Sequence, residues 1–141
     1  MNKKRNTAVF IDGENITAKK AEKIMSVVRS KGVMDYAKVY GIQKDLSTRK
    51  WTEVAACTDD MKDIRLYGGA GHNKVDKKIK KDTIKAIHNS PNIDIICIVA
   101  SDHGYASNAR ELRAMGKRVV IIGEKNTPQI LRSADNEFVM I

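Results

Sequence analysis

Short apolar runs recur along the chain, separated by polar segments that contain glycine or charged residues. Runs of this length, rich in Val, Ile and aromatic residues, are typical of buried β-strands. The most apolar run is IDIICIVA at 93–100, which stops at Ser101-Asp102. The pattern predicts strands at Thr7–Ile11, Ala37–Ile42, Asp63–Tyr67, Ile93–Ala100, Arg118–Ile122 and Phe138–Ile141.

Between the strands, apolar residues recur every three or four positions, which is the period of an amphipathic helix. In the first such segment, Ala21, Ile24, Met25 and Val28 share one face before a glycine stop at Gly32. Helices are predicted at 17–30, 51–61, 75–88, 105–115 and 128–133. Alternating strands and helices favour a mostly parallel sheet, because each crossover helix must bury its apolar stripe against a face of the sheet. We expect a single-domain, Rossmann-like three-layer α/β/α fold over residues 1–141.

Two aspartates come directly after predicted strands. Asp12 follows the first strand, and Asp102 follows the apolar strand at 93–100. In open α/β sheets, ligands bind beyond the carboxyl ends of the strands, where the strand order reverses. If these two strands are neighbours, both carboxylates face one crevice, and a hard cation such as Mg²⁺ or Mn²⁺ would offset their repulsion. Taken alone, each aspartate is more often structural or exposed than catalytic.

A third aspartate lies at the start of the helix predicted at 75–88. On a helical wheel, Asp76 falls on the apolar side and Asp82 at its edge. An unpaired buried charge is costly, so Asp76 needs a reason to be there. The alternative is that Asp76 only opposes the helix dipole near the N-terminus. Lysines occupy the opposite face, where a solvated surface is the favoured interpretation: Lys77, Lys78, Lys81 and Lys85.

Charge and composition narrow the class of partner. The formal net charge is +9 and the isoelectric point is about 9.6, which favours a polyanion without proving one. No apolar run approaches the ~20 residues of a membrane span, so no membrane partner and no secretory signal are expected. Cys57 and Cys97 lack the spacing of zinc or disulfide sites and are interpreted as buried or half-buried thiols of a cytoplasmic protein.

Four blocks of the sequence resemble a known family. AVFIDGENI, NKVDKKIKKD, IVASDHGYASNARELRAMGKRVVIIG and EKNTPQILRSADNEFVMI are similar, in this order, to blocks of the NYN domain. They are most similar to its LabA-like branch, within the PIN-like nuclease superfamily, and the resemblance runs from about Thr7 to the C-terminus. It implies a PIN-like fold, Mg²⁺ or Mn²⁺ held by clustered aspartates, and cleavage of RNA phosphodiester bonds by a metal-activated water.

The resemblance also assigns roles to individual residues. It implies that Asp12, Asp76 and Asp102 are the metal ligands and catalytic acids, and that Asn15 is the asparagine that follows the first acid. Asn15 would orient water, phosphate or a ligand carboxylate by hydrogen bonding. An N-cap of the first helix is nearly as good an interpretation of Asn15, and Thr17 is another candidate for that cap.

One position departs from the family pattern. Where the family has a block like GDSDF after the fourth strand, this chain has SDHGY, with Gly104 in place of the second aspartate. The departure implies weaker binding of one ion, substitution by His103 or by the accessory acid Asp82, or loss of catalysis.

The function predicted is that of a metal-dependent endoribonuclease acting on RNA, single-stranded RNA being the expected partner. Lys74, His103 and Arg110 are candidates for substrate contact near the crevice. A solvated surface is the favoured interpretation of Lys74 and Arg110, and a loop histidine without a role is about as good an interpretation of His103. The runner-up is a non-catalytic RNA-binding or regulatory module, and a third alternative is a hydrolase of nucleotides or small phosphoesters. A dinucleotide-dependent dehydrogenase is disfavoured, because no GxGxxG follows the first strand. Homodimer formation is left open.

Overall fold

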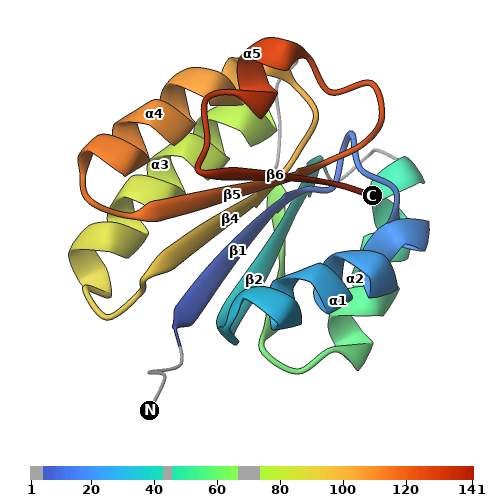
Figure 1. Ribbon diagram of the computed structural model, residues 1–141. Helices are drawn as coiled ribbons and strands as arrows, with labels where there is room; N and C mark the ends of the chain where they lie inside the picture. Colours follow the sequence, from blue (N-terminus) through green and yellow to red (C-terminus); the bar gives the residue numbers. More distant parts are fainter. Residues whose placement is uncertain (1–4, 43–45, 67–73) are drawn as a thin grey trace.

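The computed structural model of the 141-residue chain describes residues 5–42, 46–66 and 74–141. It contains one six-stranded sheet with the order β3-β2-β1-β4-β5-β6, in which every neighbouring pair is parallel (Figure 1). The strands are β1 (Asn6–Asp12), β2 (Val33–Ile42), β3 (Met61–Leu66), β4 (Ile95–Val99), β5 (Arg118–Gly123) and β6 (Glu137–Met140).

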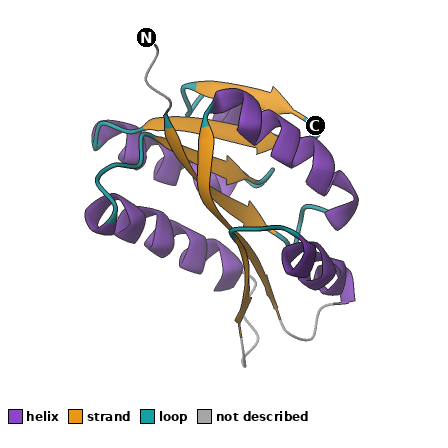
Figure 2. Cartoon of the chain, turned by 90° about the horizontal axis from the view of Figure 1, so that it is seen from below, coloured by secondary structure: helices purple, strands orange, loops and turns teal. Residues whose placement is uncertain are grey.

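Helices cover both faces of this sheet. One face is covered by α1 and α2, and the other by α3, α4 and α5 (Figures 1 and 2). The predicted α/β/α architecture is therefore confirmed. The helices are η1 (Ala18–Lys20), α1 (Ala21–Lys31), α2 (Leu46–Cys57), α3 (Lys74–Asn89), η2 (His103–Tyr105), α4 (Ala106–Ala114) and α5 (Gln129–Arg132).

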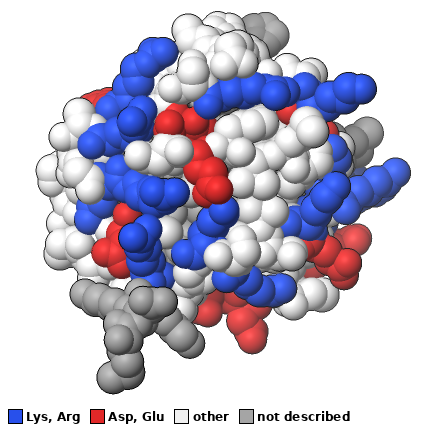
Figure 3. Space-filling model, in the orientation of Figure 1, with Lys and Arg blue, Asp and Glu red and all other residues white. Residues whose placement is uncertain are grey.

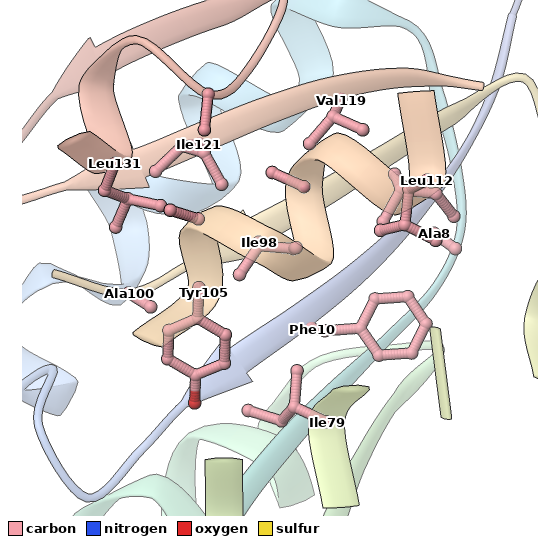
Figure 4. Close-up of a cluster of buried hydrophobic side chains, with 14 of the residues drawn as sticks. Ala8, Phe10, Ile79, Ile98, Ala100, Tyr105, Leu112, Val119, Ile121 and Leu131 are labelled. Atoms are coloured by element: carbon pink, nitrogen blue, oxygen red, sulfur yellow. The ribbon is translucent and has the colours of Figure 1, made fainter. Parts of the chain in front are cut away.

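The central strands are apolar on both sides because both sides are buried. In β4, Ile96 and Ile98 pack under α3, α4 and α5, whereas Cys97 and Val99 face the cluster under α1 and α2. This strand is fully buried along its length. Figure 4 shows the first of these clusters, in which the Tyr105 ring packs among aliphatic side chains. Continuous apolar runs are what a parallel sheet covered on both faces requires.

Some element boundaries differ from those predicted. The second helix begins at Leu46 and ends at Cys57, so that Met61, predicted to be helical, instead opens β3. Between the two elements the chain passes through Asp60, which has a positive φ of 64°, directly before β3 begins. Tyr67, the predicted last residue of that strand, lies outside the described residues. Cys97 is buried as expected, but Cys57 is exposed, because it lies on the outer side of the last turn of α2.

The order of the strands fixes where a ligand site can form. The chain runs outward through β2 and β3 on one side of β1 and then returns to place β4 on the other side. β1 and β4 are therefore neighbours, with Ile11 opposite Val99 near their carboxyl ends. The strand order reverses at this point, and the neighbouring strands bring Asp12 and Asp102 to the same edge. No helix in the described ranges is both long and apolar enough to cross a bilayer.

Candidate functional site

Asp12 ends β1 and is the most deeply buried acid at this edge, with 2% of its surface exposed. Two groups donate hydrogen bonds to the same carboxylate oxygen, Oδ2: Asn15 Nδ2 at 3.0 Å and the Tyr105 hydroxyl at 3.2 Å. The other oxygen, Oδ1, is buried and has no hydrogen-bond partner among the described residues. The two donors thus orient the carboxylate and leave one buried oxygen uncompensated.

Burial changes the acidity of both groups. Loss of solvation raises the pKa of Asp12 above its usual range, and the hydrogen bonds from Asn15 and Tyr105 offset part of that rise. Burial also raises the pKa of Tyr105, and the nearby charges of Asp12, Asp76 and Asp102 add to the effect. The Tyr105 phenol therefore stays protonated and remains a hydrogen-bond donor. Figure 4 shows its hydroxyl pointing out of the apolar cluster, toward the end of β1.

The turn after Asp12 is held close to β2. The Gly13 amide donates to the Tyr40 carbonyl oxygen at 2.9 Å, and a Cβ at Gly13 would lie only 2.8 Å from that oxygen. Glycine is therefore required by this close approach. Ile16, three residues after Gly13, accepts a hydrogen bond at its carbonyl oxygen from Trp51 Nε1 at 2.7 Å, which links the turn to α2. These contacts fix the direction in which Asp12 and Asn15 leave the strand.

Asp76 lies in the first turn of α3, and its side chain is 17% exposed. Lys80, one helical turn later, places its Nζ 3.3 Å from Asp76 Oδ1, which accepts no hydrogen bond from any residue that the structure describes. The same ammonium group lies 6.0 Å from the centre of the Tyr105 ring. The sequence prediction that Asp76 faces inward is confirmed, and Lys80 is the positive charge beside it.

Asp102 lies near the opening of the site, with 43% of its side chain exposed. Its Oδ1 accepts a hydrogen bond from the Gly104 amide at 3.0 Å and so caps the short helix η2. His103, whose side chain is 76% exposed, approaches the same oxygen with Nδ1 at 3.2 Å. The preceding Ser101 accepts a hydrogen bond from the Glu124 amide at 2.9 Å, which ties the segment to the end of β5. Asp102 thus has a structural role as well as a position at the site.

Gly104 lies between two of the acids. A Cβ built there would be 3.2 Å from Asp76 Oδ2, 3.6 Å from Asp102 Oδ1 and 3.9 Å from Lys80 Nζ. The place of the family's second aspartate is therefore at the centre of the cluster, next to a lysine ammonium. Across the described ranges, no three His, Cys, Asp or Glu side chains form a group close enough to hold a metal ion as they stand. The acids are instead engaged separately, with Tyr105, Lys80 and the Gly104 amide.

Two interpretations left open by the sequence are now resolved. Asn15 does not cap the first helix: Thr17 occupies the N-cap position of η1, without a side-chain cap bond, and the Asn15 amide binds Asp12. Asp82 is 9% exposed and has both oxygens engaged, with the Tyr40 hydroxyl at 2.6 Å and Lys78 Nζ at 3.1 Å. Because Asp82 is already compensated, the geometry gives no support to its accessory role.

The candidates for substrate contact separate in space. Lys74 opens α3, two residues before Asp76, at the same edge as the acids. Arg110 does not lie there: it lines a cavity with Arg5 and Arg118, residues at the amino ends of strands. The reason is that α4 runs antiparallel to the strands, back from the site.

Two residues of the site were not found from the sequence. Tyr105 orients Asp12, and Lys80 neutralises Asp76. The i, i+4 spacing of Asp76 and Lys80 was a signal for the ion pair, but nothing in the sequence showed that Lys80 would turn toward Tyr105. The contact of Tyr105 with Asp12 joins residues 93 positions apart and depends on the strand order.

Comparisons with known proteins agree with this architecture. The family model described as NYN domain matches residues 6–141. The crystal structure of a protein of unknown function from Vibrio parahaemolyticus superposes with a TM-score of 0.80 at 20% identity, covering 100% of this chain and 96% of that one. Nicotinic acid mononucleotide adenylyltransferase from Plasmodium falciparum, complexed with APC, gives a TM-score of 0.47 at 13% identity. The superposition covers 97% of this chain and 74% of that one, and a likeness this low says nothing of function. No curated protein matches the chain.

Proposed function

Since the chain belongs to the NYN domain family, we propose that it is a metal-dependent endoribonuclease of the LabA-like branch. Asp12, Asp76 and Asp102 would hold one Mg²⁺ or Mn²⁺ ion. The observation that carries the proposal is the buried Asp12 Oδ1, which has no partner within the described residues. An uncompensated buried carboxylate oxygen is costly, and a hard divalent cation is the kind of ligand that offsets it.

A divalent ion at this place would supply a water of lowered pKa and offset the charge that develops on the phosphate. The chain's own residues prepare the site for it. Asn15 and Tyr105 both donate to Asp12 Oδ2, so that Oδ1 is the oxygen left to bind a cation. The raised pKa of Tyr105 keeps its phenol a donor rather than a base.

Lys80 and His103 complete the proposed site. The Lys80 ammonium compensates Asp76 when no ion is bound, so it competes with the ion for that carboxylate. His103 is exposed beside Asp102, and we propose that its imidazole would donate a proton to the leaving oxygen of the phosphodiester.

Charge and family together support RNA as the substrate. The net charge of +9 favours a polyanion, and the nuclease character of the family favours RNA cleavage. We propose single-stranded RNA rather than duplex, because Asp12 is 2% exposed and the backbone of an unpaired strand can bend to reach it more easily than a duplex can. We place this activity in the cytoplasm, where the free thiols Cys57 and Cys97 would stay reduced.

The test is cleavage of labelled single-stranded RNA by the purified protein in Mg²⁺ or Mn²⁺, with EDTA and an Asp102→Asn variant as controls. Cleavage that needs the metal and is lost in Asp102→Asn supports the proposal. Cleavage that persists at the same rate in EDTA contradicts it, because the carboxylates would then act without an ion.

A non-catalytic RNA-binding module is the second candidate, and Gly104 is the observation that favours it. The chain lacks a carboxylate at the centre of the cluster, where a Cβ would lie 3.2 Å from Asp76 Oδ2. If wild-type protein binds RNA but cleaves it in neither metal, Gly104→Asp tests the cause. Cleavage gained by Gly104→Asp would identify the missing carboxylate as the lesion, and Gly104→Asn is its uncharged control.

A further inference from the structure

A cavity of about 1030 Å³ opens at the opposite edge of the sheet from the carboxylates. It is formed by the segments that lead into β1, β4, β5 and β6 and by the C-terminal end of α4. In Figure 3, the left side of the molecule, where these strands begin, carries many lysine and arginine side chains. The charged residues that line the cavity are Arg5, Asp94, Arg110, Arg113, Lys117 and Arg118.

The one carboxylate in this lining is already engaged. Asp94 Oδ2 accepts a hydrogen bond from the Asn6 amide at 3.0 Å. Two of the cations donate to neutral carbonyl oxygens: Arg113 to Ala134 at 3.2 Å and Lys117 to Ile93 at 2.6 Å. Of these two, Arg113 also lies near the Asp135 carboxylate, whose pKa its charge lowers. The lining therefore carries a net positive charge that hydrogen bonding fixes in place.

The remaining arginines are open to a ligand. The carboxylate nearest Arg118 is Glu137, at 4.0 Å, and Glu137 already pairs with Lys31 at 2.7 Å. The side chains of Arg5 and Arg110 are exposed and make no ion pair or hydrogen bond with any residue that the structure describes. Guanidinium groups match the geometry of phosphate oxygens, which they bind through paired donors. The cavity contains four arginines, and it therefore fits a phosphate ligand better than a cavity lined by the same number of lysines would.

We propose that this cavity is a second RNA site, which binds the phosphodiester backbone of a single strand without taking part in its cleavage. The inference rests on the proposed function only for the identity of the polyanion. β1 has seven residues, so at about 3.3 Å per residue the two edges are on the order of 20 Å apart. A single strand must therefore be several nucleotides long to reach from one edge to the other. A long strand engages both edges, and a very short one engages only one.

The experiment measures equilibrium binding of labelled single-stranded RNA by fluorescence anisotropy in EDTA, so that no cleavage occurs. The test variant is Arg5→Gln/Arg110→Gln. Its matched control is Lys23→Gln/Arg29→Gln, which removes the same charge from two exposed positions on α1. All four positions are exposed, so unchanged thermal midpoints should accompany both variants.

We expect the test variant to bind long RNA roughly fivefold more weakly or worse. The slope of log affinity against log salt should fall by about 1.4, or about 0.7 for each phosphate contact removed. The control should bind nearly as wild type. Equal weakening in both variants, or none in the test variant, overturns the proposal.

Two further measurements are needed. One distinguishes free phosphate from the RNA backbone as the ligand of the cavity, and the other distinguishes this cavity from the proposed nuclease site. Inorganic phosphate or a mononucleotide that displaces long RNA from this cavity in the low millimolar range would overturn the backbone proposal in favour of a small-anion site. An RNA of about four nucleotides reaches only one edge, so it should bind wild-type protein more weakly than long RNA does, and Arg5→Gln/Arg110→Gln should weaken its binding further than Lys23→Gln/Arg29→Gln does. Because binding is measured without metal, loss of affinity in Arg5→Gln/Arg110→Gln supports this site even where cleavage itself fails to appear.

Discussion

The carboxyl edge and the amino edge of the sheet hold charges of opposite sign, and they differ in how those charges are compensated. At the carboxyl edge, Asp12 is buried, and one of its oxygens has no hydrogen-bond partner within residues 5–42, 46–66 and 74–141. At the amino edge, Asp94 is satisfied by a backbone amide, and exposed arginines surround it. A buried carboxylate oxygen without a partner lowers the stability of a fold, and the metal ion proposed for the carboxyl edge would offset that cost.

The largest expected effect is on cleavage. Asp12→Asn keeps the shape of the side chain but removes the charge that would bind the ion, so we expect at least a 100-fold loss of cleavage rate, on the order of the loss of one group that stabilises a transition state. Asp35→Asn, an exposed change on β2, is the matched control and should cleave as wild type. Rates of single-turnover cleavage in Mn²⁺ measure both. Activity retained in Asp12→Asn would remove the carboxyl edge from the reaction.

Asp135 is a buried acid at the amino edge, which otherwise carries mainly positive charge. It lies two residues before β6, is 9% exposed, and has an Oδ2 without a partner among the described residues. Burial raises its pKa from 3.8 to about 6. Between these values the folded state holds more protons than the unfolded state, so this group lowers the free energy of unfolding as the pH rises from 3.8 to about 6.

Asp135→Asn should remove that pH dependence. The expected gain in unfolding free energy at neutral pH is roughly 2 kcal/mol, with little gain below the lower pKa. Urea denaturation at several pH values measures it. A gain that is the same at acid and neutral pH would mean that packing, rather than ionisation, is responsible.

The buried aspartates Asp12 and Asp82 allow a direct comparison of an uncompensated carboxylate with a compensated one. Asp12 lies opposite Tyr40 in the sheet, and Asp82 accepts a hydrogen bond from the Tyr40 hydroxyl. Asp12 has an uncompensated oxygen, whereas Asp82 has both oxygens engaged by Tyr40 and Lys78. Without metal, Asp12→Asn should raise the free energy of unfolding by about 1 kcal/mol, and Asp82→Asn should lower it by about 1 to 2 kcal/mol. Chemical denaturation in EDTA decides the signs. If both variants are destabilised, the Asp12 carboxylate is compensated after all.

The smallest expected effect concerns the lysine inside the acid cluster. Lys80→Met removes the ammonium that pairs with Asp76 at 3.3 Å. A divalent ion would then meet no competitor there, and we expect Mn²⁺ to bind about tenfold more tightly. Lys81→Met, at the exposed neighbouring position, is the control. Calorimetric titration with Mn²⁺ measures the affinity, and weaker binding in Lys80→Met would show that the lysine helps to build the site.

The sequence predicted the parts of the site that follow from the strand ends. Asp12 and Asp102 could be placed together because parallel strands present their carboxyl ends at one edge, and Asp76 because it interrupts an apolar helical face. Arg110 was misplaced, since closeness to Asp102 along the chain ignored the path of α4. At about 1.5 Å per residue, that helix carries Arg110 away from the acids.

The contacts that set the chemistry were beyond prediction for a physical reason. The Tyr105 bond to Asp12 and the position of Lys80 beside Gly104 depend on how α3 and η2 pack, at the level of single ångströms. Periodicity determines which face of a helix is buried, but not which side chain fills a given space on that face. The basic cavity was missed because its residues come from four separate stretches of the chain.

Single-turnover cleavage of a long single-stranded RNA tests most directly whether the carboxyl edge cleaves RNA while the amino edge only binds it. It compares wild-type protein with Asp102→Asn and with Arg5→Gln/Arg110→Gln, in Mn²⁺, as the protein concentration is raised. We predict that Asp102→Asn binds RNA but does not cleave at any concentration. The arginine variant should need more protein for half-maximal rate yet reach the wild-type rate at saturation. Full cleavage by Asp102→Asn at saturation, or a lost maximal rate in the arginine variant, would contradict the account.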